Sequence, residues 1–284
     1  LSSDHCMSSE ELSPPLDFEW FSEQIAGHLP IIKNGKQQIG IMKKANGNVI
    51  YKACQEGKRG EREVAFYEMI TKRDDGDTKE AEVLKEFRRF TPRFEGVEKI
   101  RIRGEDHDFM VMEDVSAPFS KPATIDVKIG LVTYDPEASL EKRLSESAKY
   151  TPQKTLGFRI CGYRLHTDNG MKYKDKHWGR TITEDAIERV FEEYLSARPH
   201  SEYLQLLIHR LQEIHVLFST QRLVHLYSSS LLIIYEADST KPPKIDIRLI
   251  DFSHAFPGEG RLDGNYLPGL VKLLSIFESF LPSS

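Results

Sequence analysis

Two aspartates stand where carboxylates could serve the transfer of a phosphoryl group. Asp126 and Lys128 lie two residues apart among apolar residues, and Asp251 ends a separate apolar run that continues into Phe252. Residues two apart on an extended segment project to one face, so the first pair would set a proton acceptor beside a phosphate-binding cation. Asp251, at the end of an apolar strand, is placed to hold Mg²⁺ against a nucleotide. Singly, each aspartate is better explained as a turn cap, but the two in this order favour phosphoryl transfer.

Lys52 and Glu63 form a second candidate pair. Lys52 falls at the end of a predicted strand, and Glu63 falls in the first turn of the predicted helix that follows. Kinase-type folds use such an ion pair to hold a lysine against the phosphates of a nucleotide. On spacing alone, an ordinary exposed pair explains these residues better. The sequence has no P-loop and no G-x-G-x-x-G, so any phosphate site has to be built from separate charges.

Further basic residues lie downstream of the first aspartate. Lys142 and Lys149 are seven residues apart in the predicted short helix 140–149, so both ammonium groups lie on one helical face and can point at one polyanion. Without other information, a solvated charged face explains them better. His254, three residues after Asp251, is equally compatible with a packed polar core position.

The first half of the chain predicts a small α+β unit that positions Lys52 and Glu63. Asn46-Gly47 between two apolar alternations predicts a hairpin with a type I′ turn, in which both residues have positive φ. Helical periodicity follows, and strand composition returns before Val115. The predicted order is two strands, two helices and a strand, at residues 39–42, 49–53, 61–73, 83–90 and 109–113.

The second half predicts mostly helices, with a hairpin that carries Asp251. Thr181 and Glu184 have the spacing of a capping box at the start of the first long helical stripe. Only the short stretch 116–122 joins the two halves, so two lobes should share a cleft between them. The predicted helices run through residues 187–194, 204–218 and 267–281, and the predicted strands are 229–236 and 244–251.

Composition limits the possible functions. The chain has 284 residues, is 39% hydrophobic and carries a net charge of −5, so its size suits an enzyme and its charge disfavours nucleic acid or an anionic membrane. An anionic ligand would need a local basic patch. Cys6, Cys54 and Cys161 are far apart and match no metal-ligand spacing, which favours a reducing compartment. No apolar stretch approaches the ~20 residues of a membrane span, so we expect a soluble intracellular protein with a disordered leader at residues 1–15.

Three motifs, met in this order, resemble the signature of the inositol polyphosphate kinase family. They are P-x-x-x-D-x-K-x-G at 122–130, S-S-L-L at 229–232 and I-D-F-x-H at 250–254. The resemblance covers about residues 26–280, and within the family the chain most resembles the multikinase branch. It extends to the segments 59–63, 134–136, 139–142 and 178–180.

This resemblance implies a two-lobed α+β kinase-like fold that uses ATP and Mg²⁺. The N-lobe would be 16–115, with an antiparallel sheet, and the C-lobe 116–284, mainly helical, with a substrate-binding helical segment at 137–155. The implied catalytic residues are Asp126, Lys128 and Asp251. Those implied for ATP are Lys52, Glu63, Glu113, Val115, Asp126 and Asp251, with the backbone of Glu113 and Val115 facing adenine. Those implied for inositol phosphates are Arg59, Lys128, Lys142, Lys149, Lys176 and His254, and those implied for the metal are Asp251 and Ser230.

The substrate and some contacts stay open at this point. A hexakisphosphate kinase that makes pyrophosphates and a trisphosphate 3-kinase are alternatives within the family, although the short span between Gly130 and Leu156 disfavours the second. A catalytically dead inositol-phosphate-binding scaffold is the alternative from another class. Lys176 and Ser253 depart from the family pattern, which has glutamine and a smaller residue there. We expect a monomer, in nucleus and cytoplasm, with small inositol phosphates as its partners and no nucleic acid.

Overall fold

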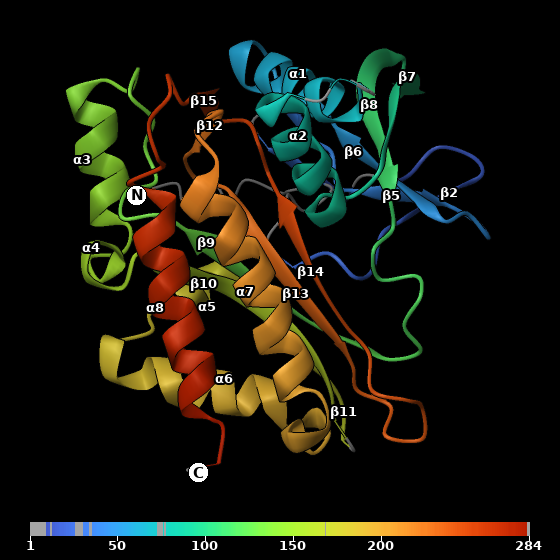
Figure 1. Cartoon of the computed structure of the whole chain (residues 1–284). Coiled ribbons are helices and arrows are strands. Elements are labelled where there is room, and N and C mark those ends of the chain that lie inside the picture. Colours follow the sequence, from blue (N-terminus) through green and yellow to red (C-terminus); the bar gives the residue numbers. More distant parts are fainter. Residues whose placement is uncertain are drawn as a thin grey trace, which may run out of the picture.

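The structure, a computed structural model, describes residues 10–11, 13–25, 31–33, 36–72, 76, 78–167 and 169–282. It has two lobes, each built on a five-stranded antiparallel sheet, with helices packed on both (Figure 1). The predicted α+β class is therefore confirmed. The expectation of a disordered leader falls mostly on residues outside the described ones; within it, Glu10–Glu11 (β1) pairs with Ile31–Lys33 (β3), which also pairs with Lys36–Gln38 (β4).

The N-lobe sheet has the strand order β2-β5-β6-β8-β7. The predicted hairpin forms, but its turn is not type I′: Asn46 has a φ of 61° whereas Gly47 is not in the positive-φ region, and the Gly47 N–H donates to the Lys44 carbonyl. β7 was not predicted because most of its side chains are exposed, which removes the apolar alternation that marks a strand. The strands are Phe18–Trp20 (β2), Met42–Lys44 (β5), Val49–Ala53 (β6), Phe94–Ile102 (β7) and Glu105–Glu113 (β8).

Helices Lys58–Thr71 (α1) and Lys79–Phe90 (α2) bury their apolar faces against the C-lobe as well as the N-lobe sheet. Thr78 caps α2 by accepting a hydrogen bond from the Ala81 N–H. The largest core of the molecule runs from these two helices into the C-lobe sheet, while a smaller core lies on the other face of the N-lobe sheet. One continuous core therefore holds both lobes around the cleft.

The C-lobe is centred on a sheet with the order β11-β10-β9-β13-β14, in which β9 carries the first aspartate. The hairpin of β13 and β14 was predicted, but β10 and β11 were not. β10 is buried along most of its length and begins with Phe-Arg-Ile-Cys-Gly-Tyr, with a bulge near Gly162. Its sequence therefore lacks the alternation of apolar and polar residues that predicts a strand. The strands are Pro122–Ile129 (β9), Phe158–Thr167 (β10), Gly170–Lys174 (β11), Ser230–Glu236 (β13) and Ile245–Ile250 (β14).

Three long amphipathic helices cover one face of this sheet, as predicted (Figure 1). They are Ile187–Tyr194 (α6), Leu204–Thr220 (α7) and Tyr266–Ser279 (α8). The predicted capping box is wrong: Thr181 donates its hydroxyl to the Trp178 carbonyl, and Glu184 begins a short 3-10 turn before α6. No helix among the described residues is long and apolar enough to cross a membrane.

The remaining elements are short. The predicted basic helix is present as Leu140–Ala148 (α3), which stands at the edge of the molecule and buries none of its residues (Figure 1). The others are Gln153–Leu156 (α4), Lys176–Gly179 (α5), the 3-10 turns Glu184–Ala186, Leu195–Ala197 and His200–Glu202, and the paired strands Val224–Leu226 (β12) and Ala255–Pro257 (β15).

Candidate active site

The central strand β9 directs Asp126 and Lys128 to the same side of the sheet, as their spacing predicts. Both line one cavity, and the Lys128 ammonium donates to the carbonyl and the hydroxyl of Ser228 at 3.0 and 2.9 Å. Gly130 follows the strand with a φ of 131°, and a Cβ there would lie 2.6 Å from the side-chain amide of Asn265. Only glycine fits this bend, which turns the chain toward α3.

Asp126 is a buried carboxylate with an unusual pKa. Its residue is 5% exposed, and burial raises its pKa to about 6, with a further contribution from the Asp251 carboxylate and opposition from Lys128. The Ser230 hydroxyl lies beside it and also opposes the shift, yet Asp126 Oδ1 and Ser230 Oγ have no hydrogen-bond partner within the described part of the chain. A carboxylate that titrates near neutral pH is suited to accept a proton from a hydroxyl group.

Lys52 bridges two carboxylates from distant parts of the chain. Its ammonium lies 2.7 Å from Glu63 Oε1 on α1 and 2.6 Å from Asp251 Oδ1 after β14. Burial opposes the charged form of Lys52, but Asp251 and Glu63 outweigh this effect and raise its pKa above the ordinary value. The Glu63 side chain is fully buried, so this is not the exposed pair that spacing alone suggested.

The segment after β14 is held in place by Glu63. Its carboxylate accepts the Phe252 N–H at 3.3 Å and the Ser253 hydroxyl at 3.1 Å. Phe252 stacks on Phe66 with ring centroids 4.1 Å apart, and Asp251 has a φ of 66°, a left-handed conformation that aspartate tolerates. One buried glutamate thus orients both Lys52 and the backbone that carries Asp251.

A mostly apolar cavity of about 190 Å³ opens beside this group, between the two lobes. Its lining includes residues 113–115, here called the hinge, and it ends at Asp126 and Asp251. Lys43 fixes the hinge from one side through an ion pair of 2.6 Å with Asp114. The apolar walls are formed by Ile39, Ile41, Ile50, Met112, Val115, Leu232, Ile234 and Ile250.

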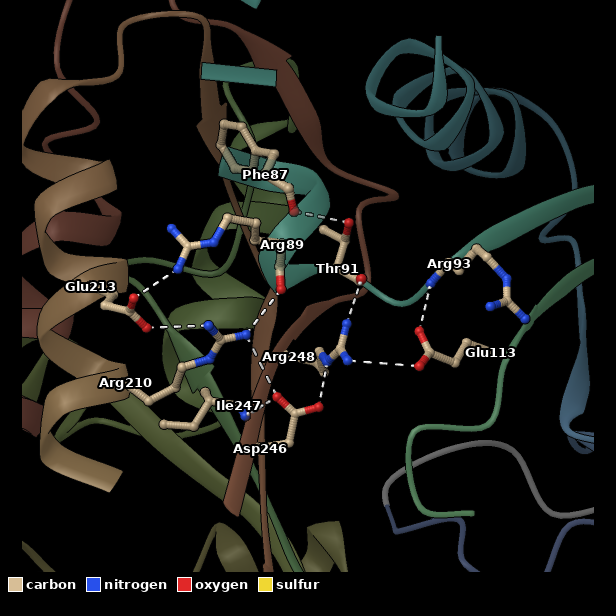
Figure 2. A network of polar contacts seen from close by, with 10 residues as sticks. All are labelled: Phe87, Arg89, Thr91, Arg93, Glu113, Arg210, Glu213, Asp246, Ile247 and Arg248. Carbon is tan, nitrogen blue, oxygen red and sulfur yellow. Dashed lines mark hydrogen bonds and ion pairs between the residues drawn. The ribbon is translucent and has the colours of Figure 1, made fainter. Parts of the chain in front are cut away.

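A polar network fixes the hinge from behind (Figure 2). The Glu113 carboxylate accepts the backbone N–H of Arg93 at 3.0 Å and lies 3.7 Å from the Arg248 guanidinium. Arg248, on β14, also donates to Asp246 at 2.6 Å and to the Thr91 carbonyl at 3.0 Å. Figure 2 shows the network continuing through Asp246 to residues of α7 and α2. The hinge is therefore tied to the C-lobe through Arg248 and Asp246, which do not line the cavity.

A second cavity, of about 700 Å³, lies on the other side of Asp126 and has a strongly basic wall. Five carboxylates face it, against ten lysines and arginines, in a chain whose net charge is −5. The local basic patch that an anionic ligand requires is thus present. The basic residues are Lys52, Lys58, Arg59, Arg62, Lys128, Lys142, Lys149, Arg159, Lys176 and Arg180.

The structure brings every residue expected to bind inositol phosphate to this second cavity. His254 lies there with Nδ1 2.5 Å from Asp135 Oδ2; burial lowers the pKa of the imidazole although Asp135 opposes the shift. Lys142 and Lys149 also reach it, but each forms an ion pair with Glu146, at 2.6 and 2.7 Å. Both lysines therefore reach one cavity, as their spacing predicted, but they are already paired with the same carboxylate.

The two cavities meet at four shared residues: Lys52, Gln55, Asp126 and Asp251. An apolar pocket with a hinge on one side and a polycationic pocket on the other suit a nucleotide and a polyanion whose reacting ends meet between them. The family model described as inositol polyphosphate kinase matches residues 109–278, which include the whole basic wall from Lys128 onward. The chain belongs to the inositol polyphosphate kinase family.

Individual members of this family are similar over most of the chain. The human inositol polyphosphate multikinase is 32% identical over 248 residues, which is 85% of this chain and 56% of the relative. The multikinase alpha of Arabidopsis thaliana is 28% identical and covers 92% of this chain and 95% of the relative, and mouse inositol hexakisphosphate kinase 3 is 30% identical over 60% of this chain. The chain spans about half the length of the mammalian multikinases it matches.

A solved structure gives the same fold. The crystal structure of the inositol phosphate multikinase Ipk2 from S. cerevisiae, in complex with ADP and Mn²⁺, superposes with a TM-score of 0.67 at 27% identity. It covers 83% of this chain and 100% of the yeast chain. The two-lobed kinase-like architecture predicted from the motifs is confirmed by this match.

The family implies a divalent metal, and the residues present fit one. Among the described residues, no three histidine, cysteine or acidic side chains are grouped so that they could hold a metal ion by themselves. Mg²⁺ in kinases, however, is bound by one or two carboxylates together with phosphates of the nucleotide. Asp251 and Asp126 face each other at the junction of the cavities, and Asp126 Oδ1 and Ser230 Oγ are buried without a hydrogen-bond partner in the described chain. These oxygens suit a hard cation that arrives with the nucleotide.

Sequence reasoning missed several polar residues of the basic cavity, among them Arg159 and Glu146. Arg159 on β10 is buried, lies opposite Lys128 in the sheet and faces the same cavity. No sequence signal marks it, because β10 itself was not predicted. Glu146 was detectable, since it lies four residues after Lys142 and three before Lys149, the spacings at which helical side chains form ion pairs.

Proposed function

We propose that this protein transfers the γ-phosphoryl group of ATP to a hydroxyl group of a soluble inositol polyphosphate, as a multikinase does. The observation that carries this proposal is the junction of an apolar, hinge-lined cavity with a basic cavity at Lys52, Asp126 and Asp251. The similarity to multikinases supports the proposal, and so does the ADP in the yeast relative.

Each step of the proposed phosphoryl transfer depends on particular residues of the chain. Asp126 orients the attacking hydroxyl and accepts its proton, a role that its pKa of about 6 permits at neutral pH. Lys52, held by Glu63, binds the nucleotide phosphates, and Lys128 offsets the charge that moves toward the acceptor. Residues 113–115 present their backbone to adenine, and the basic wall binds the phosphates of the inositol ring. Such a reaction depends on positioning and charge neutralisation and needs no covalent nucleophile.

Asp251, with Ser230 and Asp126 nearby, would hold Mg²⁺. Bound there, the metal neutralises negative charge on the phosphates. In the structure Asp251 is paired with Lys52, which holds the carboxylate at the junction of the two cavities.

A substrate panel tests the proposal. The purified protein is incubated with ATP, Mg²⁺ and single inositol phosphates from tris- to hexakisphosphate, and products are separated by anion-exchange chromatography. We expect rapid use of tris- and tetrakisphosphates and neglect of the hexakisphosphate. A preference for hexakisphosphate would establish the pyrophosphate-forming kinase instead, conversion of trisphosphate alone would establish the 3-kinase, and binding without turnover the inactive scaffold. Asp106→Asn, in an exposed pair far from the cleft, serves as the control variant.

Two further expectations belong to the same proposal. The resemblance to multikinases supports a nuclear and cytoplasmic location, and a fluorescently tagged protein excluded from the nucleus would contradict it. We also expect the active form to be a monomer. Size-exclusion chromatography with light scattering should give the mass of one chain, 32.7 kDa.

A further inference from the structure

One carboxylate in the basic cavity opposes the charge that surrounds it. Glu146 Oε1 lies 2.6 Å from the Lys142 ammonium and 2.7 Å from that of Lys149, so one oxygen accepts from both. Its side chain is 12% exposed and lines the cavity, although α3 buries no residue in the core of the protein. Glu146 is thus turned toward the ligand space rather than toward solvent.

The carboxylate is negative at any physiological pH. Burial would raise the pKa of Glu146, but the hydrogen bonds from Lys142 and Lys149 outweigh it and lower the pKa to about 2. The group of three side chains therefore carries one net positive charge instead of two. A phosphate that approaches either lysine must share the ammonium group with Glu146 or displace the Glu146 carboxylate from it. In both cases two negative groups, the phosphate and the carboxylate, lie side by side.

The other four carboxylates that face the cavity have different partners. Asp126 and Asp251 lie at the junction with the nucleotide cavity, Asp135 contacts His254, and Glu137 forms an ion pair of 2.5 Å with Arg62. Among the described residues that line the cavity, Glu146 is the carboxylate that pairs with both Lys142 and Lys149.

We propose that Glu146 is a specificity-determining residue that restricts how heavily phosphorylated the bound inositol may be. A carboxylate accepts a hydrogen bond from a ring hydroxyl but repels a phosphate, so the subsite beside α3 favours an inositol phosphate that presents a hydroxyl there. Lys142 and Lys149 still bind phosphates on either side of it. This proposal rests on the proposed function, since it assigns the class of substrate that the same cavity selects.

Binding measurements test the proposal without relying on turnover. The dissociation constants of an inositol trisphosphate and of inositol hexakisphosphate are measured by titration calorimetry for the wild type and for Glu146→Gln. The amide keeps the shape of the side chain and removes its charge. We expect hexakisphosphate to bind about tenfold more tightly to the variant, since a like charge at contact distance is removed, and trisphosphate to change less than about threefold.

Two more variants test whether the effect depends on a negative charge at position 146. Glu146→Asp keeps the charge and should keep the wild-type preference. Glu141→Gln removes the same charge from an exposed position on α3 that does not line the cavity, and should leave both dissociation constants unchanged.

Three results would overturn the proposal. Equal tightening of both ligands would show that Glu146 sets only the overall charge, and weaker binding of both would show that it merely holds the lysines in place. An unchanged hexakisphosphate affinity would show that no phosphate comes near it. The kinase panel stands apart: failure of all turnover would refute the proposed reaction, whereas the ratio of the two dissociation constants decides the role of Glu146 in either case.

Discussion

The buried carboxylate of Asp126 should cost the protein stability while it serves the reaction. Replacing it by asparagine keeps the shape of the side chain and removes its charge. We expect Asp126→Asn to be more stable than the wild type at pH 8 and at the same time to lose at least ~10²-fold in kcat, the scale of a lost general base, with inositol phosphate binding largely kept.

The magnitude follows from the pKa. Burial and the nearby Asp251 raise the pKa of Asp126 from 3.8 to about 6, and each pH unit corresponds to about 1.4 kcal/mol. A raised pKa in the folded state favours the protonated form, so ionisation of Asp126 destabilises the fold progressively as pH rises from 3.8 to 6. Above pH 6 the variant should therefore gain about 3 kcal/mol in free energy of unfolding, with roughly half of this gain at pH 5 and little of it at pH 4.

Urea denaturation at several pH values measures this difference. Tryptophan fluorescence follows unfolding, since the chain has two tryptophans, and the difference between variant and wild type cancels the titration of other groups. Asp106→Asn removes an exposed carboxylate and should show no such pH dependence. A difference between Asp126→Asn and wild type that stays constant from pH 4 to 8, or a destabilised variant at pH 8, would refute the assignment of a buried, electrostatically strained carboxylate.

Three further outcomes are expected. Asp251→Asn should abolish phosphoryl transfer at ordinary Mg²⁺ concentrations, because an amide cannot offset a divalent charge; near-normal steady-state turnover would remove this residue from the metal site. The double variant Lys142→Ala, Lys149→Ala should raise the KM for inositol phosphate at least ~10-fold with the KM for ATP unchanged, and the difference should shrink at high salt; matching KM values would place the substrate elsewhere. Arg248→Met should raise the KM for ATP about three- to tenfold and leave the KM for inositol phosphate unchanged, because the variant removes the ion pair and hydrogen bonds that hold the hinge from behind. A loss of thermal stability with an unchanged KM for ATP would mean that the network of Figure 2 is only structural.

The sequence determined those features that depend on neighbours along the chain. Helices α6, α7 and α8 follow from apolar residues at helical spacing, the β13–β14 hairpin from alternation, and the shared face of Asp126 and Lys128 from the geometry of an extended strand. Local rules failed where the local signal was weak: β7 is too exposed and β10 too buried for alternation, and Thr181 found a partner in its own turn instead of capping a helix.

Tertiary structure alone decided how the charges of the site are paired. Lys52 meets Asp251 across 199 residues of sequence, and His254 meets Asp135 across 119. Spacing could not show these contacts, because they depend on how one core joins the two lobes. Burial, which also depends on the tertiary structure, excludes water from Asp126 and so raises its pKa. It also places the Lys52–Glu63 ion pair in the interior, although the spacing of the two residues suggests an ordinary exposed pair. The residue types and motifs thus came from the sequence, whereas their protonation and their partners came from the fold, since charge interactions depend on distance and dielectric rather than on position in the chain.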